Sequence, residues 1–423
     1  MTRSSRLQSS RAVLSWVSAG LAVLLLGLPQ LASAQIAEVD LRSGVFHEPS
    51  AQSHMTVLTP SATITAAPAS AVSVTGSYQA DIVSGASESV KAGPQLSSFP
   101  DIVSAASVTD FRHVASGAVD IQRRHTKLGL QYAYGTELDY KSQSFVVSAG
   151  TDFLQRNTEM EISYAKGFDK VCNMAHADGA PPMYRARLDS SVGCFTEADD
   201  RSEDDIDMDT FQGVWTQSWT PILTTQLIAS ASLLHGFLGN PYRGVVVGPS
   251  GIAAQEHHPT DRSRLALSMK TKLYIRSLKT ATTLSFRGYR DSWEILSHTV
   301  GLDMDRHLSS WLRLNAHARY YAQTGAHFWS DDYTGGEPLN GPRGQYWSGD
   351  RELSPLKTYS GGTRFVAEWR GRSGGRLLGM FLNFSTSLSA DLVKTDLENF
   401  TWAGTKPDDT LAGVASFSLT TLF

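Results

Sequence analysis

The feature that most constrains this chain is a period-two alternation of apolar and polar residues, repeated in segments of roughly ten residues. In the closing segment "TLAGVASFSLTTLF", every second residue from Leu411 to Phe423 lies on one face of an extended chain, and Ala412 to Thr420 lie on the other. The same pattern recurs at residues 72–82, 128–134, 160–164, 265–275 and 312–320. One such segment also fits a soluble sandwich, but the repeated series indicates a transmembrane β-barrel.

The lengths of the links between these segments support the barrel. Short turns are predicted near residues 67–70, 123–125, 153–157, 220–222, 276–279, 307–310 and 370–375. Longer links are predicted near 84–108, 169–207, 237–261, 323–357 and 389–409, with brief ones near 138–141 and 291–294. Outer-membrane barrels have short periplasmic turns and long external loops. With residues 37–46 and 53–66 as the first two strands, we expect sixteen antiparallel strands and both termini in the periplasm.

The first 34 residues have the pattern of a removable signal peptide. Three arginines precede the apolar run "AVLSWVSAGLAVLLLGL", and small residues at Ala32 and Ala34 form a cleavage site. The alternative interpretation is a transmembrane anchor, but the apolar run is short for a span and lacks a stop-transfer flank. We therefore expect residues 1–34 to be removed and residues 35–423 to form one barrel domain in the outer membrane of a Gram-negative bacterium.

Charge and cysteine content exclude several classes of protein. A formal charge of −4 gives no electrostatic basis for nucleic-acid binding. The two cysteines, Cys172 and Cys194, fit one disulfide of an exported protein better than a metal site, although two free thiols are the alternative. No dinucleotide or phosphate-loop fingerprint appears, so we expect no cofactor and no metal.

Several motifs point to one family. They occupy residues 75–87, 108–121, 136–169, 236–245, 256–267, 288–304, 319–329 and 349–362. Together they resemble the outer-membrane barrel family catalogued as domain of unknown function three-five-seven-zero. The resemblance spans nearly the whole mature chain and implies an exported barrel with no established substrate or activity.

The "GNPYR" motif supplies two candidates for the external rim, Tyr242 and Arg243. As a turn, it would pin its loop against the barrel mouth, with Tyr242 at the interface and Arg243 bonding to carbonyls. The alternative is a rim that contacts a ligand. Because Asn, Pro and Gly are turn residues first, the structural interpretation is favoured.

Strand parity also predicts the charges inside the barrel, because Arg or Lys facing lipid at the midplane costs about 2–4 kcal/mol. The lumen candidates are Asp81, Asp120, Glu159 and Glu161 on earlier strands, and Lys270, Lys272, Arg287, Arg313, His317, Arg319 and Arg364 on later strands. One wall would then be mainly acidic and the opposite wall mainly basic. Pairs that neutralise each other across a filled lumen are the alternative.

No catalytic residue is expected. His317 and Asn315 share a predicted inward face, but no serine stands at position 319 as a nucleophile. Asp291, Asp303 and His298 suit acid–base chemistry by type, yet parity turns His298 outward. The acidic run at 197–209 lacks the pattern of a calcium loop and is predicted to be a solvated loop, with divalent-cation binding as the alternative.

The leading functional hypothesis is a porin-like or substrate-selective channel for small polar solutes. A loop-plugged structural or binding barrel and a membrane-embedded hydrolase are the rivals. The expected partners are outer-membrane lipid and lipopolysaccharide, a small polar solute, and the barrel-assembly machinery, which would contact the terminal Phe423.

Overall fold

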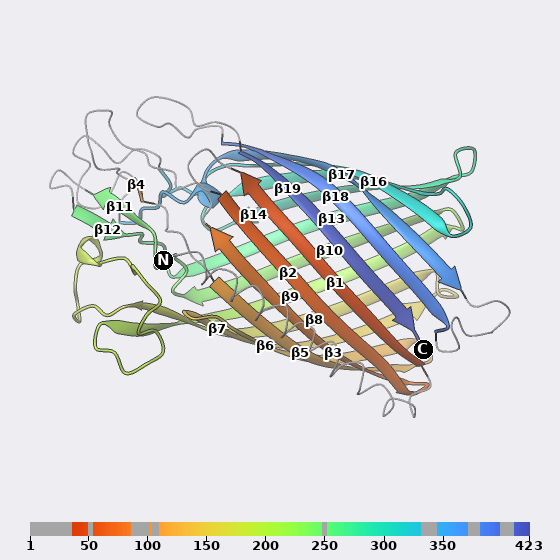
Figure 1. Cartoon of the computed structure of the whole chain (residues 1–423), viewed down its shortest axis with the longest axis horizontal. Helices are drawn as coiled ribbons and strands as arrows, with labels where there is room; N and C mark the ends of the chain where they lie inside the picture. The colour runs from red at the N-terminus through yellow and green to blue at the C-terminus, as the bar shows by residue number, and fades with distance from the viewer. Residues whose placement is uncertain are drawn as a thin grey trace, which may run out of the picture.

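Sixteen antiparallel strands close into a barrel in the computed structural model (Figure 1). The structure describes residues 36–49, 54–85, 102–103, 110–247, 252–330, 345–370, 381–397 and 410–423. Each barrel strand pairs with the next barrel strand along the chain, and the first pairs with the last, so the wall has no free edge. The predicted fold and strand number are confirmed. The predicted signal peptide lies outside the described residues.

The strand bounds follow most of the predicted segments, but residues 389–396, predicted to belong to a long link, are part of a strand. The barrel strands are β1 (Ile36–Pro49), β2 (His54–Ala69), β3 (Val72–Gly85), β5 (Asp110–Arg123), β6 (Thr126–Thr136), β7 (Tyr140–Phe153), β8 (Thr158–Met174), β9 (Arg201–Thr220), β10 (Leu223–Gly236), β13 (Asp261–Ile275), β14 (Thr280–Asp291), β15 (Leu296–His307), β16 (Leu312–Gln323), β17 (Leu356–Arg370), β18 (Asn383–Asp396) and β19 (Thr410–Leu422). A separate small sheet joins β12 (Ile252–Gln255), β11 (Gly244–Val247) and β4 (Ile102–Val103). The 3-10 turns η2 (Pro182–Tyr184) and η3 (Arg351–Leu353) lie in the loops.

The end of the chain is part of the wall. Strand β19 pairs with β18 on one side and with β1 on the other, where Leu419 lies opposite Leu41. The amide N–H of Phe423 donates to the carbonyl of Ala37 at 2.8 Å, and its ring lies 5.2 Å from that of Phe381. The alternation therefore runs to the last residue because this strand completes the closure.

The two ends of the barrel differ in their links. The short turns between β2 and β3, β5 and β6, β7 and β8, β9 and β10, β13 and β14, and β15 and β16 share one end with the C-terminus (Figure 1). The small sheet lies at the opposite end (Figure 1). The part of the predicted turn beyond Arg370 lies outside the described residues.

Strands β8 and β9 extend further than the sequence indicated. Their ladder continues to the pair Met174–Arg201, so the link between them spans only 175–200. Lys170 Nζ lies 2.8 Å from a carboxylate oxygen of Glu203, and Asn173 donates to Asp204 at 2.7 Å. The prediction that the acidic run is a solvated loop was wrong, because most of this run is the outer part of β9 and pairs with polar residues of β8.

The largest fully buried side chains gather at the long-link end of the barrel. We call this region the cap, formed by residues 175–200, 237–247, 252–260, 292–295, 324–330 and 345–355. Its largest cluster includes Trp293, Phe328 and Leu353, and a second joins Val245, Ala254 and Trp347. Among the described residues, no helix is long and apolar enough to cross a membrane.

Candidate functional site

The candidate site is the polar face of the barrel wall together with the cap above it. Directly paired residues in a sheet share a face, so register carries the face assignment from strand to strand. Asp81 pairs with Arg112, Ser163 with Gln212, Ser268 with Arg287, and Asn315 with Arg364. Followed around the wall, the register places all eleven predicted lumen residues on one face.

The opposite face carries large apolar side chains that are exposed in the isolated chain. Ile162 is 66% exposed, Leu267 58% and Leu284 55%. In a barrel that spans a membrane, such a face contacts lipid and the polar face encloses the lumen. We therefore treat the polar face as the inward one.

The inward charges do not separate cleanly into two walls. Glu159 on the predicted acidic side has a lysine partner, since Lys127 Nζ lies 2.7 Å from its carboxylate. On the other side, Arg313 approaches Glu368 at 4.0 Å, and His317 pairs with Asp391. Part of each predicted wall is thus neutralised locally, by neighbours on adjacent or nearby strands.

A surplus of positive charge nevertheless remains on strands β13 to β16. Within the described part of the chain, no ion pair engages Lys270, Lys272, Arg287 or Arg319. Asp303 and Asp305 also face inward on these strands, but two carboxylates do not balance the four basic side chains. This arc of the wall is therefore basic.

Small hydroxyl side chains line another arc of the inward face. Ser387 and Ser418 hydrogen-bond to each other at 2.7 Å, as do Ser389 and Ser416. They border a cavity of about 490 Å³ that also contacts Arg364. Short side chains leave this part of the interior open.

His317 borders the same cavity but has no ring nitrogen free to act as a base. Its Nδ1 lies 3.1 Å from Asn315 Oδ1, and its Nε2 contacts the Asp391 carboxylate. A general base must reach the proton of a nucleophile, and the paired serines bond to one another instead. This geometry gives no support to acyl transfer.

The second acid–base grouping does not assemble. Asp291 Oδ2 accepts from Arg262 Nε at 2.9 Å and from Tyr289 at 2.8 Å, while its other oxygen accepts the amide of Ile295 at 2.9 Å. His298 pairs across the ladder with Ala322 and faces outward, as parity predicted. Asp291 is a structural residue that holds the β14–β15 turn. The described residues also contain no cluster of three His, Cys, Asp or Glu side chains suited to a metal ion.

The cap is held by a buried ionic network that sequence reasoning missed. Arg243 pairs with the Asp350 carboxylate, rather than with the carbonyls we expected. Glu256 accepts from the amide of Gly349 at 2.9 Å and lies 3.3 Å from His258 Nε2. Arg243 and Asp350, like Glu256 and Gly349, are about a hundred residues apart in sequence, so no local pattern could have joined them.

Burial affects the two carboxylates of this network differently. Burial raises the pKa of Asp350 above its usual range, although Arg243 opposes the change. Burial alone would also raise the pKa of Glu256, but His258, Arg243 and the Gly349 amide outweigh it and lower that pKa. The network therefore favours a charged Glu256 and a more easily protonated Asp350.

Two local features position the "GNPYR" loop. Gly236 has a φ of +120°, and a Cβ there would lie 2.0 Å from the carbonyl oxygen of Asp205, so only glycine fits where the chain leaves β10. Tyr242 donates its hydroxyl to Asp139, and its amide donates to Asn240 at 2.9 Å. The predicted rim pair thus fastens the loop, Tyr242 to the β6–β7 link and Arg243 within the cap.

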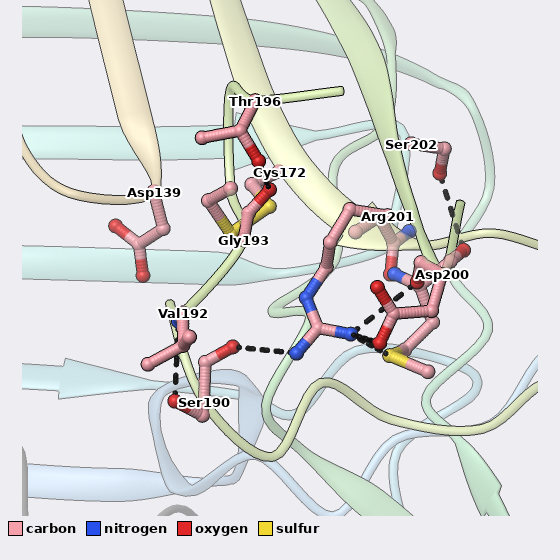
Figure 2. Close-up of a disulfide and its surroundings, with 12 residues drawn as sticks. Asp139, Cys172, Ser190, Val192, Gly193, Thr196, Asp200, Arg201 and Ser202 are labelled. Carbon is pink, nitrogen blue, oxygen red and sulfur yellow. Dashed lines mark hydrogen bonds and ion pairs between the residues drawn. A yellow bond between two sulfur atoms is a disulfide. The ribbon is translucent and has the colours of Figure 1, made fainter. Parts of the chain in front are cut away.

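The predicted disulfide between Cys172 and Cys194 is confirmed (Figure 2). It joins the outer end of β8 to the 175–200 link, with 5.6 Å between the two Cα atoms. Arg201 packs nearby and donates to Asp200 at 2.8 Å and to the carbonyl of Ser190 at 3.3 Å (Figure 2). The disulfide thus anchors the cap directly to the wall.

Solved structures similar to this chain include outer-membrane proteins by their titles. A "Bacterial polysaccharide outer membrane secretin" has a TM-score of 0.46 and 9% identity, covering 92% of this chain and 98% of that one. OccAB1 of Acinetobacter baumannii has a TM-score of 0.43 and 8% identity, covering 92% and 96%. The outer membrane protein opdK from Pseudomonas aeruginosa has a TM-score of 0.41 and 9% identity, covering 92% and 99%. The closed pairing of the strands establishes the barrel.

The family assignment rests on sequence. No curated protein matches this chain. The family model described as "Protein of unknown function (DUF3570)" matches residues 17–373, which is most of the chain and includes the motifs noted above. The chain therefore belongs to the DUF3570 family.

Proposed function

We propose that this protein is a porin-like channel of the outer membrane that lets small polar solutes diffuse through its lumen. The observation that carries the proposal is an inward face that is both charged and open. Lys270, Lys272, Arg287 and Arg319 face the interior and yet are exposed. In a barrel filled by its own side chains, these groups would pack against partners. Sixteen strands are enough to enclose an aqueous channel.

The outer face supports a membrane location. Apolar side chains face outward, and several aromatic side chains lie at the short-turn end. The rings of Trp311 and Trp369 stack at 6.3 Å, and Phe381 contacts Phe423. Aromatic girdles of this kind lie at membrane interfaces. In the outer membrane, this end would face the periplasm and the cap would lie beside lipopolysaccharide, while Phe423 would be available to the assembly machinery.

The surplus of inward positive charge gives the proposed channel a preference for anions. Clefts lined by one sign of charge raise the local concentration of the opposite ion. The basic arc on β13 to β16 should therefore favour anionic over cationic solutes of equal size.

The cap supports a second candidate, a plugged barrel that acts through its external surface. Trp347 and Phe328 are 1% and 0% exposed, so the described loops form packed structure instead of extended arms. In this case the cap would carry the function of the protein, and no solute would pass through the lumen.

Single-channel recording in planar bilayers separates the two candidates. We expect discrete conductance steps and a reversal potential that indicates anion preference. Replacing Arg313 and Arg319 together with Gln should move the reversal potential toward cations, whereas Arg290→Gln, on the outward face, should leave it unchanged. A correctly folded protein that stays silent would support the plugged barrel. An unchanged reversal potential in the double variant would show that these arginines do not line the conducting path.

A further inference from the structure

We propose that a recess under the cap, between Arg287 and Arg319, binds the carboxylate group of a small organic anion. This inference deepens the proposed function, because the recess lies on the inward wall that solutes would pass. We call it the arginine recess. Its lining includes Arg262, Arg287, Tyr289, Arg319, Tyr321 and Glu352.

The shape of the recess follows from small residues on β15. Arg287 on β14 lies opposite Thr299, and Arg319 on β16 lies opposite Gly301. The central strand therefore presents little side chain, while the strands on either side present long arginines. Adjacent strands are about 4.8 Å apart and the two positions are offset by two residues, about 6.6 Å, along the strands, so these side chains start roughly 12 Å apart and are long enough to converge on one small group.

The cap closes the recess from above. Gln323 on β16 donates to the carbonyls of Glu352 at 2.8 Å and Ser354 at 2.7 Å, which holds η3 against the wall. Leu353 packs into the main cluster of the cap. The volume of the recess is about 250 Å³, just below the usual range for drug-sized ligands, so it suits a smaller solute.

The charges around the recess select an anion. Arg262 is already neutralised by Asp291, at 2.9 Å, and lies over the ring of Trp293 at 3.9 Å. Arg287 and Arg319 are without ion pairs in the described part of the chain, and Glu352 adds one carboxylate to the lining of the recess. Two unpaired arginines and one glutamate leave a charge of +1. That balance matches one carboxylate better than a doubly charged phosphate.

The choice of arginine adds a geometric argument. A guanidinium presents a planar fork that matches both oxygens of a carboxylate, whereas a lysine acts as a point charge. Tyr289 lies beside Arg287, whose guanidinium is 6.0 Å from the ring centroid, and offers an apolar surface next to the charge. An aromatic monocarboxylate such as benzoate therefore fits the recess in charge and in surface.

Calorimetric titration of the full-length, folded protein in detergent tests this site without requiring conduction. We expect sodium benzoate to bind to the wild type, and Arg287→Gln with Arg319→Gln to weaken binding at least about tenfold, since charged hydrogen bonds are lost. The matched control, Lys270→Gln with Lys272→Gln, removes two inward charges that do not line the recess and should bind as the wild type does. Arg287→Lys, which keeps the charge but loses the fork, should bind with intermediate affinity.

Several results would overturn the site. They are no binding of benzoate to the folded wild type, equal losses in the two double variants, or tighter binding of inorganic phosphate than of benzoate. Outer-membrane barrels commonly resist detergent until they are heated, so unheated and heated samples of a folded barrel migrate differently on a gel. This heat-dependent gel shift, if every variant shows it, would exclude misfolding as the cause. Because binding and conductance are measured separately, a silent barrel that binds benzoate contradicts the channel alone, and a conducting barrel that does not bind it contradicts the recess alone.

Discussion

The barrel wall and the cap are built on opposite principles. In the wall, large apolar side chains such as Leu130 and Leu388 are 57% and 59% exposed, while polar side chains face in. In the cap, Trp347, Phe328 and Leu188 are almost completely buried, as in the core of a soluble domain. In the proposed membrane location, the wall relies on its closed hydrogen-bonded ladder and on lipid, whereas the cap relies on packing, ion pairs and a disulfide. The two regions should therefore fail under different perturbations.

The largest effect is expected from breaking the buried network of the cap. Arg243→Met leaves Asp350 and Glu256 buried without their shared cation, which should destabilise the cap by about 3–5 kcal/mol. We expect the fluorescence of the buried tryptophans to change at a lower denaturant concentration than in the wild type. The barrel should keep its heat-dependent gel shift. Loss of both signals together would show that cap and wall unfold as one unit.

The outer face of the wall gives the next largest effect. Leu284→Arg places a charge near the middle of the lipid-facing surface and should cost about 2–4 kcal/mol in lipid. Its neighbour Thr283 faces inward beside Asp303, so Thr283→Arg is a matched control that should cost far less. Equilibrium unfolding in vesicles measures both. Equal costs would contradict the assignment of faces.

The disulfide should stabilise the cap more than the wall. Closing the 23-residue segment from Cys172 to Cys194 constrains the unfolded chain by roughly 3 kcal/mol in the entropy model. In Cys172→Ser with Cys194→Ser, protease should cut the 175–200 link sooner while the barrel strands stay protected. Mass spectrometry of the non-reduced wild type should show neither thiol alkylated, and free alkylation of both would exclude the bridge.

The same contrast explains what the sequence could predict. The wall could be predicted because each strand has its own alternation of apolar and polar residues. In "TKLGLQYAYG", for example, Leu128, Leu130 and Tyr132 alternate with Gly129 and Gln131. A closed barrel needs little more than these alternations and the lengths of the links. The disulfide was also predictable, because only two cysteines were present to pair.

The structure of the cap could not be predicted from the sequence, for a physical reason. Its structure depends on contacts such as Arg243 with Asp350, and Trp347 with the carbonyl of Gln255, which join distant parts of the chain. Tryptophan and histidine in a long link have no period that reveals their partners. The arginine recess is an intermediate case. Parity gave the inward direction of Arg287 and Arg319, but only the strand register placed them on either side of the small residues of β15.

The smallest predicted effect is on the pH dependence of the cap. Asp350 has a raised pKa in the folded state, so its contribution to stability is present at low pH and is lost as pH rises through that pKa. Glu256 has a lowered pKa, so its contribution is present above its ordinary range near 4.5 and is lost as pH falls below it. Stability of the cap should therefore peak at mildly acidic pH. Asp350→Asn should remove the decline on the alkaline side only, as measured by denaturant midpoints between pH 4 and 8. A profile unchanged by this variant would contradict the role of Asp350.

The central claim is that the wall has one face in lipid and one face in water beneath the cap, and cysteine accessibility tests it most directly. Single cysteines are placed on β16 at the inward positions Asn315 and Arg319 and at the outward positions Ala316 and Ala318, in protein reconstituted into vesicles. The native cysteines form a disulfide and should not react. We predict that a membrane-impermeant, water-soluble maleimide labels the inward pair and spares the outward pair. Labelling of both pairs alike, or of neither, would contradict the account.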